Sequence, residues 1–272
     1  MSFAHWCGVA ALLATLAAGC GDDASGSTQV VVDGDAAIDD IKALVYLLEQ
    51  PDVEILAITV SGTGIAHCPV AAENISATLA RIDAPDIPVA CGRNTPLGGA
   101  NEAPEAFRNA ADTLGGVDLP EATDLADTSA PDMLIETLAE ADDIVVVATG
   151  PLTNIAEAFR SDPTLVDHIE TMYLMGGAVD VGGNVLYGNP DAEFNIWADP
   201  RAAAEVFETD VPITLIPLDA TNALPLTPYH YEAVEAHRTA SPVTEFLAEY
   251  LEVTPLYGGM YHWDELAAVA AT

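Results

Sequence analysis

Four aspartates stand close together near the start of the sequence. The stretch VVVDGDAAIDDI, residues 30–41, holds Asp33, Asp35, Asp39 and Asp40 directly after a run of valines. One aspartate at a helix start is ordinary, because it accepts hydrogen bonds from free N–H groups and complements the helix dipole. Four carboxylates repel one another and raise one another's pKa unless a cation neutralises them. Because no Cys or His stands among them, the ligand chemistry favours Ca²⁺ or Mg²⁺ over zinc, and we prefer a metal site to capping alone.

Further polar groups stand near later apolar runs. ATGPLTNIA (148–156) follows one run and opens a helical pattern, so we expect the carbonyl of Thr149 to face the same crevice. HWDELAAVA (262–270) places Asp264 at the start of another helical pattern, where on its own it would be an N-cap.

The segment GNVLYGNPDAEFNIWADP (183–200) is predicted to be a loop, and it holds Asn184, Glu193 and Asn195. Beside a metal site such side chains suit a polyhydroxyl ligand, because each can hydrogen-bond a sugar hydroxyl. The alternative is turn chemistry alone, which is common for Asn next to Gly.

Strand-like apolar runs alternate with helical patterns along the chain. The strand runs lie at 29–33, 53–60, 87–92, 143–149, 171–177 and 212–219. Helical patterns include 38–50, 71–82, 130–141, 153–161 and 199–209. This alternation predicts an α/β fold with a doubly wound, mostly parallel sheet that carries helices on both faces. Ligands of such sheets bind beyond the carboxyl ends of the strands, which is where the aspartates stand.

The charge of the chain limits its partners. Seven Lys and Arg against 43 Asp and Glu give 7 − 43 = −36 in 272 residues. A surface of this sign repels phosphate backbones and anionic lipid, so we expect no nucleic-acid partner. Most of these carboxylates are expected to be solvated surface groups.

The N-terminus has the pattern of an export signal. Residues 8–19 form an apolar run too short to span a bilayer, and small residues precede Cys20. LAAGC resembles a bacterial lipobox, in which Cys20 would be lipidated and would be the protein's one link to a membrane. Because MSFAHW has no Lys or Arg, a soluble secreted form is the alternative. We expect a signal over 1–20, a flexible tether over 21–28, a single domain over 29–272 and a periplasmic or extracellular location.

Two of the cysteines remain inside the predicted domain if Cys7 leaves with the signal and Cys20 takes lipid. Cys68 and Cys91 fall near the same edge of the predicted sheet, and in an oxidising compartment they could form a disulfide. The alternative is two small buried residues in unrelated places.

DGDAAIDD resembles the D-x-D-P-G-x-D-D signature of the inosine-uridine preferring nucleoside hydrolases. Further segments follow the family's order through most of the chain: EILAITV, ATGPLTNIA, YLMGGA, AEFNIWADP, PLDATN and WDELAAVA. The resemblance implies hydrolysis of the N-glycosidic bond between ribose and a nucleobase, with a tightly held Ca²⁺. It also suggests a homo-oligomer, a dimer or a tetramer.

The resemblance also implies roles for individual residues. Asp35, Asp40, Asp264 and the carbonyl of Thr149 match the calcium ligands, and Asp35 matches the general base. Asp33 matches the first aspartate of the signature, for which we expect a structural role.

The substrate positions follow in the same way. Asp39 matches an acceptor of a ribose hydroxyl. Asn184, Glu193 and Asn195 match ribose-binding positions, and Met175 matches a residue that packs beneath the sugar.

The chain departs from the family pattern in several places. Ala36 and Ala37 replace the Pro-Gly of the signature, and Thr63 replaces a common Asn that contacts ribose or water. Trp263 stands where many members have a His that protonates the leaving base, so it either stacks on a purine or packs in the core. The chain also stops at AAVAAT, where members usually continue, so we expect a short C-terminus.

Two hypotheses from different classes follow. The first is an exported, calcium-dependent enzyme that hydrolyses ribonucleosides. The second is a non-catalytic protein on the same fold that binds calcium and a nucleoside; Thr63 and Trp263 favour it, whereas the retained Asp35 favours the enzyme. A third hypothesis is an enzyme that acts on a different N-riboside.

Overall fold

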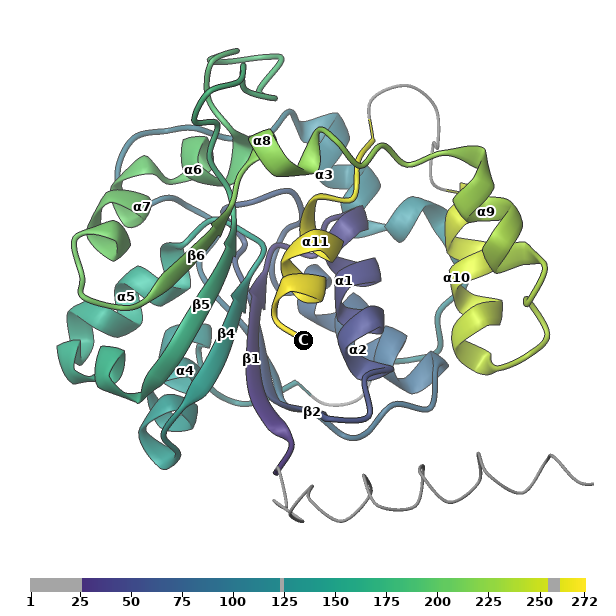
Figure 1. Ribbon diagram of the computed structural model, residues 1–272, viewed down its shortest axis with the longest axis horizontal. Coiled ribbons are helices and arrows are strands. Elements are labelled where there is room, and N and C mark those ends of the chain that lie inside the picture. Colours follow the sequence, from purple (N-terminus) through teal and green to yellow (C-terminus); the bar gives the residue numbers. More distant parts are fainter. Residues whose placement is uncertain (1–25, 123–124, 254–259) are drawn as a thin grey trace, which may run out of the picture.

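The computed structural model describes residues 26–122, 125–253 and 260–272. Its centre is a six-stranded sheet in the order β3-β2-β1-β4-β5-β6, in which every neighbouring pair is parallel (Figure 1). The strands are β1 Thr28–Gly34, β2 Val53–Val60, β3 Val89–Cys91, β4 Ile144–Ala148, β5 Ile169–Met175 and β6 Ile213–Ile216. All six predicted strand runs are confirmed, and so is the doubly wound α/β fold.

Helices cover both faces of this sheet (Figure 1). The longer helices are α1 Ile38–Leu48, α2 Val70–Arg81, α3 Glu105–Asp112, α4 Ala130–Glu140, α5 Thr153–Ser161, α7 Pro200–Phe207, α9 Pro228–Glu235, α10 Pro242–Val253 and α11 Trp263–Ala270. Two short helices are α6 Phe194–Ala198 and α8 Leu218–Thr221. Short 3₁₀ turns occupy Leu114–Gly116 and Pro163–His168.

The valines of β1 show how the sheet is held between its helices. Val30 and Val32 belong to one hydrophobic cluster together with residues of α1, α2, α10 and α11. Val31 points to the opposite face and belongs to a second cluster with residues of α4, α5 and α7. Successive side chains of a strand point to opposite faces, so a continuous apolar strand needs a helical layer on each side.

The order of the strands reverses between β1 and β4. From β1 the chain moves outward to β2 and β3, and it then returns to the other side of β1. At such a reversal the loops that leave the carboxyl ends of the two central strands diverge and leave a crevice for a ligand. The acidic motif, residues 33–40, runs from the end of β1 through the following loop into the first turn of α1, and Thr149 follows β4 directly.

Several predictions concern residues outside the described part. The predicted signal over 1–20, the lipidation of Cys20 and most of the tether lie outside it. Within the described residues, no helix has both the length and the apolar composition needed to cross a bilayer.

Candidate active site

Asp33 lies inside β1 and is fully buried. Its Oδ1 accepts hydrogen bonds from Thr59 Oγ1 of β2 and from Asn154 Nδ2 of α5, both at 2.7 Å. Burial raises the pKa of this carboxyl to about 7, against the opposing effect of these two donors. The contacts tie β1 to its neighbours below the crevice and support a structural role.

The turn from β1 to α1 has a conformation of its own. Ala36 has a φ of +56°, in the left-handed region, where proline with its φ fixed near −65° cannot stand. Ala37 then begins α1 as its N-cap, and its N–H donates to Asp40 Oδ2 at 2.9 Å and to Asp35 Oδ1 at 3.2 Å. With Ala36 and Ala37 in place of the Pro-Gly pair, the chain adopts a turn that proline does not allow. The turn still holds Asp35 and Asp40 by hydrogen bonds from the Ala37 N–H.

Three carboxylates from two helices converge near the carboxyl ends of β1 and β4. Asp39 and Asp40 lie in the first turn of α1, and Asp264 lies in the first turn of α11, which packs beside α1 (Figure 1). Oxygen atoms of the three residues all lie within 4.8 Å of one another. Desolvation and mutual repulsion raise the pKa of Asp40 and of Asp264 well above the usual range, and burial raises the pKa of Asp39 to about 7.

The donor chemistry of this cluster fits a hard divalent cation. The three side chains offer carboxylate oxygens, without a thiolate or an imidazole, which is the ligand preference of Ca²⁺ or Mg²⁺. The arrangement groups Asp39 with Asp40 and Asp264, whereas the resemblance assigned Asp35 to the metal and Asp39 to the sugar. A cation here would compensate for the desolvation and the repulsion that together raise these pKa values.

Asp35 lies next to this cluster but has different partners. Its Oδ2 accepts a hydrogen bond from the Ile65 N–H at 2.9 Å, in the loop that follows β2. Burial raises the pKa of Asp35, while these backbone donors and the positive charge of Arg108 oppose the shift. The raised pKa makes the carboxylate a better proton acceptor, which suits a general base.

Thr149 connects the carboxylate cluster to the end of β5. Its hydroxyl donates to Asp40 Oδ1 at 2.6 Å, and its N–H donates to the Asp33 carbonyl at 2.8 Å. Its carbonyl accepts from Asn195 Nδ2 at 2.9 Å, and the same amide donates to the Met175 carbonyl at 3.1 Å. Asn195 therefore joins the ends of β4 and β5, and the predicted Thr149 ligand is held in place by hydrogen bonds.

The segment 183–200 is not a loop throughout, which corrects the sequence-based prediction. Glu193 is the N-cap of α6 and accepts from the N–H groups of Asn195, Ile196 and Gly177, each at 3.0 Å. Asn184 Oδ1 accepts from the Phe194 N–H at 2.8 Å. The pattern was missed because the helix spans little more than one turn and its contacts involve distant backbone.

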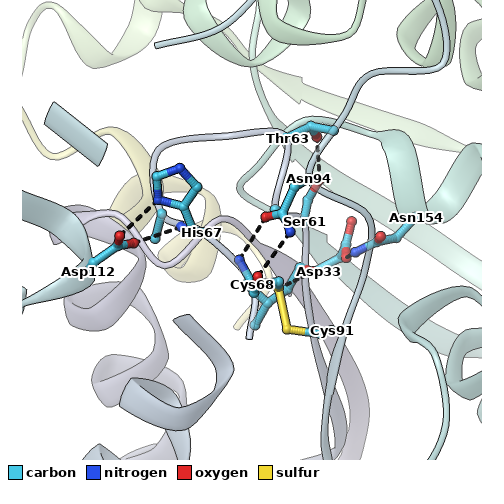
Figure 2. Close-up of a disulfide and its surroundings, with 12 residues drawn as sticks. Asp33, Ser61, Thr63, His67, Cys68, Cys91, Asn94, Asp112 and Asn154 are labelled. Carbon is cyan, nitrogen blue, oxygen red and sulfur yellow. Dashed lines mark hydrogen bonds and ion pairs between the residues drawn. A yellow bond between two sulfur atoms is a disulfide. The ribbon is translucent and has the colours of Figure 1, made fainter. Parts of the chain in front are cut away.

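Thr63 is buried in a chain of hydroxyl groups. Its Oγ1 lies 2.7 Å from Ser61 Oγ and 2.8 Å from Thr153 Oγ1, and Thr153 donates onward to Asp199. Figure 2 shows the Thr63 side chain together with Ser61, on the loop that follows β2. The threonine that replaces the family's Asn thus connects this loop to α5.

Trp263 is partly buried and packs against the core, with its ring 5.6 Å from that of Tyr261. Its Nε1 is buried without a hydrogen-bond partner among the described residues. The neighbouring His262 points elsewhere: Nδ1 lies 2.9 Å from Glu265 Oε1, and its ring contacts that of His230.

Cys68 and Cys91 form a disulfide that joins the loop after β2 to the end of β3, with their Cα atoms 5.8 Å apart (Figure 2). Asn94 accepts from the Cys68 N–H and donates to the Cys68 carbonyl, both at 2.9 Å. The loop that carries Ile65 is therefore fastened at its far end.

Three residues next to this loop were not predicted from the sequence: Arg108, His67 and Asp112. Arg108 is buried, with 1% of its surface exposed, and its guanidinium binds backbone carbonyls of the loop. The chain has seven basic residues, so a buried one is unusual, but the local sequence of α3 does not show that Arg108 points inward.

Comparison with known proteins shows which family this chain belongs to. The family model described as inosine-uridine preferring nucleoside hydrolase matches residues 30–272. The pyrimidine-specific ribonucleoside hydrolase RihA of Salmonella enteritidis is 34% identical over 240 residues, which cover 87% of this chain and 73% of the relative.

Solved structures give the same result. The inosine-uridine preferring nucleoside hydrolase of Bacillus anthracis has a TM-score of 0.76 at 28% identity, covering 89% of this chain and 80% of that one. The purine-preferring ribonucleoside hydrolase of Gardnerella vaginalis has a TM-score of 0.77 at 30% identity, covering 90% of this chain and 79% of that one. The chain therefore belongs to the inosine-uridine preferring nucleoside hydrolase family.

Proposed function

We propose that this protein is an exported, calcium-dependent enzyme that hydrolyses ribonucleosides to ribose and free base. Its relatives are named ribonucleoside hydrolases, so the reaction class is that of an N-glycosyl hydrolase. The dependence on calcium and the export are the parts that this proposal adds.

One observation carries the proposal. Carboxylate oxygens of Asp39, Asp40 and Asp264 lie within 4.8 Å of one another in a crevice at the strand reversal, with Asp35 beside them. Buried carboxylates at this spacing destabilise the fold unless they bind a cation or act in chemistry. When bound, the cation would order ribose hydroxyls and lower the pKa of a water.

The side chains of the chain have distinct tasks in this proposal. Asp40 and Asp264, with the Thr149 carbonyl, hold the cation, while Asp39 lies where it can serve the cation or a ribose hydroxyl. Asp35 takes a proton from the attacking water as the general base. The surrounding carboxylates favour the positive charge that develops on the sugar as the bond to the base breaks.

The sugar would lie between the acidic cluster and the ends of β4 and β5. We place Asn184, Asn195 and Met175 on that side of the sugar. The carboxylate of Glu193 is occupied by three N–H groups of the backbone. We therefore infer that Glu193 positions α6 and Asn195, in addition to any contact with ribose.

Release of ribose by residues 21–272 from a panel of purine and pyrimidine ribonucleosides tests the proposal. The panel needs both kinds of base because one relative is named pyrimidine-specific and another purine-preferring. We expect release with calcium and none with a chelator. Release that continues undiminished with chelator would contradict the role of the cation.

The second candidate is a protein that binds calcium and a nucleoside without hydrolysis. Trp263, which stands where many members have a proton-donating His, favours this candidate. Calorimetry would decide between the two: nucleoside binding that depends on calcium, without release of ribose from any substrate, supports the binding protein.

Export and lipidation need a separate experiment in the full chain. Metabolic labelling with a fatty acid should mark the wild type and leave a Cys20→Ala variant unlabelled. A labelled Cys20→Ala variant would exclude this anchor, and an unlabelled wild type that is found outside the cell would favour the soluble secreted form. Gel filtration of the mature protein tests the expected homo-oligomer.

A further inference from the structure

Arg108 of α3 holds the loop that follows β2. Its Nη1 donates to the Gly64 carbonyl at 2.8 Å, and its Nη2 donates to the Gly62 carbonyl at 2.9 Å. A further contact reaches the Ala66 carbonyl at 3.5 Å. The planar fork of a guanidinium can bind several carbonyls of one turn at once, which an ammonium group cannot do in the same geometry.

The other edge of this guanidinium is fixed by a histidine and an aspartate. Arg108 Nε donates to His67 Nε2 at 2.7 Å, and His67 Nδ1 lies 2.8 Å from Asp112 Oδ2. Because arginine has no acceptor, His67 must accept at Nε2 and donate its Nδ1 proton to Asp112. Figure 2 shows the His67 ring turned toward Asp112, whose other oxygen accepts from the His67 N–H at 2.8 Å.

The loop that Arg108 holds is the same loop that contacts Asp35. The Ile65 N–H donates to Asp35 Oδ2 at 2.9 Å, and the Ala66 N–H donates to the Asp35 carbonyl at 3.3 Å. Gly64 lies so close that an added Cβ would stand 2.0 Å from Asp35 Oδ2. A small shift of the loop therefore moves the hydrogen-bond donor of Asp35.

Arg108 also differs from the other basic residues. The chain has seven Lys and Arg, and the other six each form an ion pair with a carboxylate. Among the described residues, no carboxylate lies within ion-pair distance of Arg108. A buried charge is costly unless it is compensated, and here the compensation comes from loop carbonyls and from the field of the nearby Asp35.

We propose that Arg108, oriented by His67 and Asp112, is a positioning residue that fixes Asp35 for hydrolysis through the loop 62–66. The proposal rests on the proposed role of Asp35 as the general base. The guanidinium of Arg108 binds loop carbonyls and His67, so in this proposal it acts on Asp35 through the loop.

The first test compares two Arg→Lys variants. Arg108→Lys keeps the charge and loses the fork, whereas Arg160→Lys makes the same change in a surface ion pair with Glu205. Displacement of a catalytic group by about 1 Å costs roughly 100-fold in rate, so we expect kcat of Arg108→Lys to fall about 100-fold with KM within about threefold. Arg160→Lys should keep the wild-type kcat. A folded Arg108→Lys variant with wild-type kcat would overturn the proposal.

The second test does not depend on activity. Hydrogen exchange of the Ile65 amide should be at least about tenfold faster in Arg108→Lys than in the wild type, because opening of the loop exposes this donor. If Arg108→Lys does not fold, Asp112→Asn serves instead, since it removes the charged acceptor of His67 and leaves Arg108 in place. Unchanged exchange in the folded variant would overturn the proposal.

The two kinds of failure remain distinct. A wild-type protein that releases no ribose would refute the proposed function, while the exchange rate of Ile65 would still decide whether this relay holds the donor of Asp35. An active wild type with an Arg108→Lys variant that exchanges faster but keeps its kcat would refute the positioning role alone.

Discussion

Two buried acidic regions flank the crevice, and their hydrogen bonding differs. On one side, Glu193 caps α6 and accepts from three backbone N–H groups at 3.0 Å. On the other side, Asp40 and Asp264 lie near each other and Asp39 across the ends of two helices, and desolvation, together with repulsion from neighbouring carboxylates, raises the pKa of both. Desolvation raises the pKa of Glu193 too, but the three N–H donors oppose that rise.

The difference in hydrogen bonding separates Glu193, whose contacts stabilise the fold, from Asp39, Asp40 and Asp264, whose burial costs stability. Charge-assisted hydrogen bonds from three N–H groups offset part of the desolvation cost of Glu193, although its pKa stays above the usual value. The aspartate cluster leaves part of its desolvation cost uncompensated until a ligand arrives, which is typical of functional sites. The acidic motif thus gives up stability at the place where a cation would bind.

The largest expected effect is on the rate of hydrolysis, and it comes from Asp35, the proposed general base. Asp35→Asn should lower kcat by about 1,000-fold, because an amide cannot take a proton from water. Steady-state release of ribose measures the effect, and the exposed Asp86→Asn is the control for a change of charge alone. A loss smaller than about tenfold would mean that another group is the base.

The pH dependence of the free energy of unfolding tests a further buried carboxylate, Asp33. Its second oxygen is buried without a hydrogen-bond partner among the described residues. Burial raises its pKa from the usual 3.8 to about 7 in the fold. Between about pH 4 and pH 7 the folded protein thus retains a proton that the unfolded chain has lost, so stability falls as pH rises through this window.

For one such group the loss amounts to about 4 kcal/mol. Urea unfolding of the metal-free protein at a series of pH values measures it, and Asp33→Asn should make the profile less steep in that window by the share of this one group. A stability that increases from pH 4 to pH 7, or an unchanged profile in the variant, would show that Asp33 is ionised in the fold.

Glu193→Gln tests the stabilising side. The amide loses the negative charge that strengthens three N–H hydrogen bonds, and one of its ends becomes a donor that faces a donor. We expect the free energy of unfolding to fall by about 2 kcal/mol with or without calcium. Chemical denaturation measures the loss, and Glu208→Gln, an exposed carboxylate at the end of α7, is the matched control.

Much of the fold was predictable because its signals are local. Six continuous apolar runs separated by helical patterns indicate a parallel sheet, and the position of Asp35, Asp39 and Asp40 follows from the junction of β1 with α1. That Thr149 meets them also follows, since the carboxyl ends of parallel strands share one edge of the sheet.

The features that could not be predicted from the sequence depend on contacts between distant residues or on short, irregular segments. Arg108 and His67 are separated by 41 positions, and nothing in the local pattern of α3 shows that its arginine points inward. The role of Glu193 as an N-cap depends on a helix of five residues, which is too short for a periodic signal. The left-handed φ of Ala36 likewise has no local signature, because alanine rarely adopts it.

Asp264→Asn tests the aspartate cluster. Here the expected change in the free energy of unfolding is the smallest, and its sign is opposite to that of Glu193→Gln. Removal of one charge from the cluster relieves the repulsion with Asp39 and Asp40, so the metal-free protein should gain about 1 kcal/mol in the free energy of unfolding. Calcium affinity should fall at least about tenfold, because affinity follows the number of charged ligands. Calorimetry and denaturation with chelator measure the two effects, with Asp132→Asn in the first turn of α4 as the control. A metal-free variant less stable than the wild type would mean that Asp264 serves as a cap like Glu193, and the contrast between the two regions would disappear.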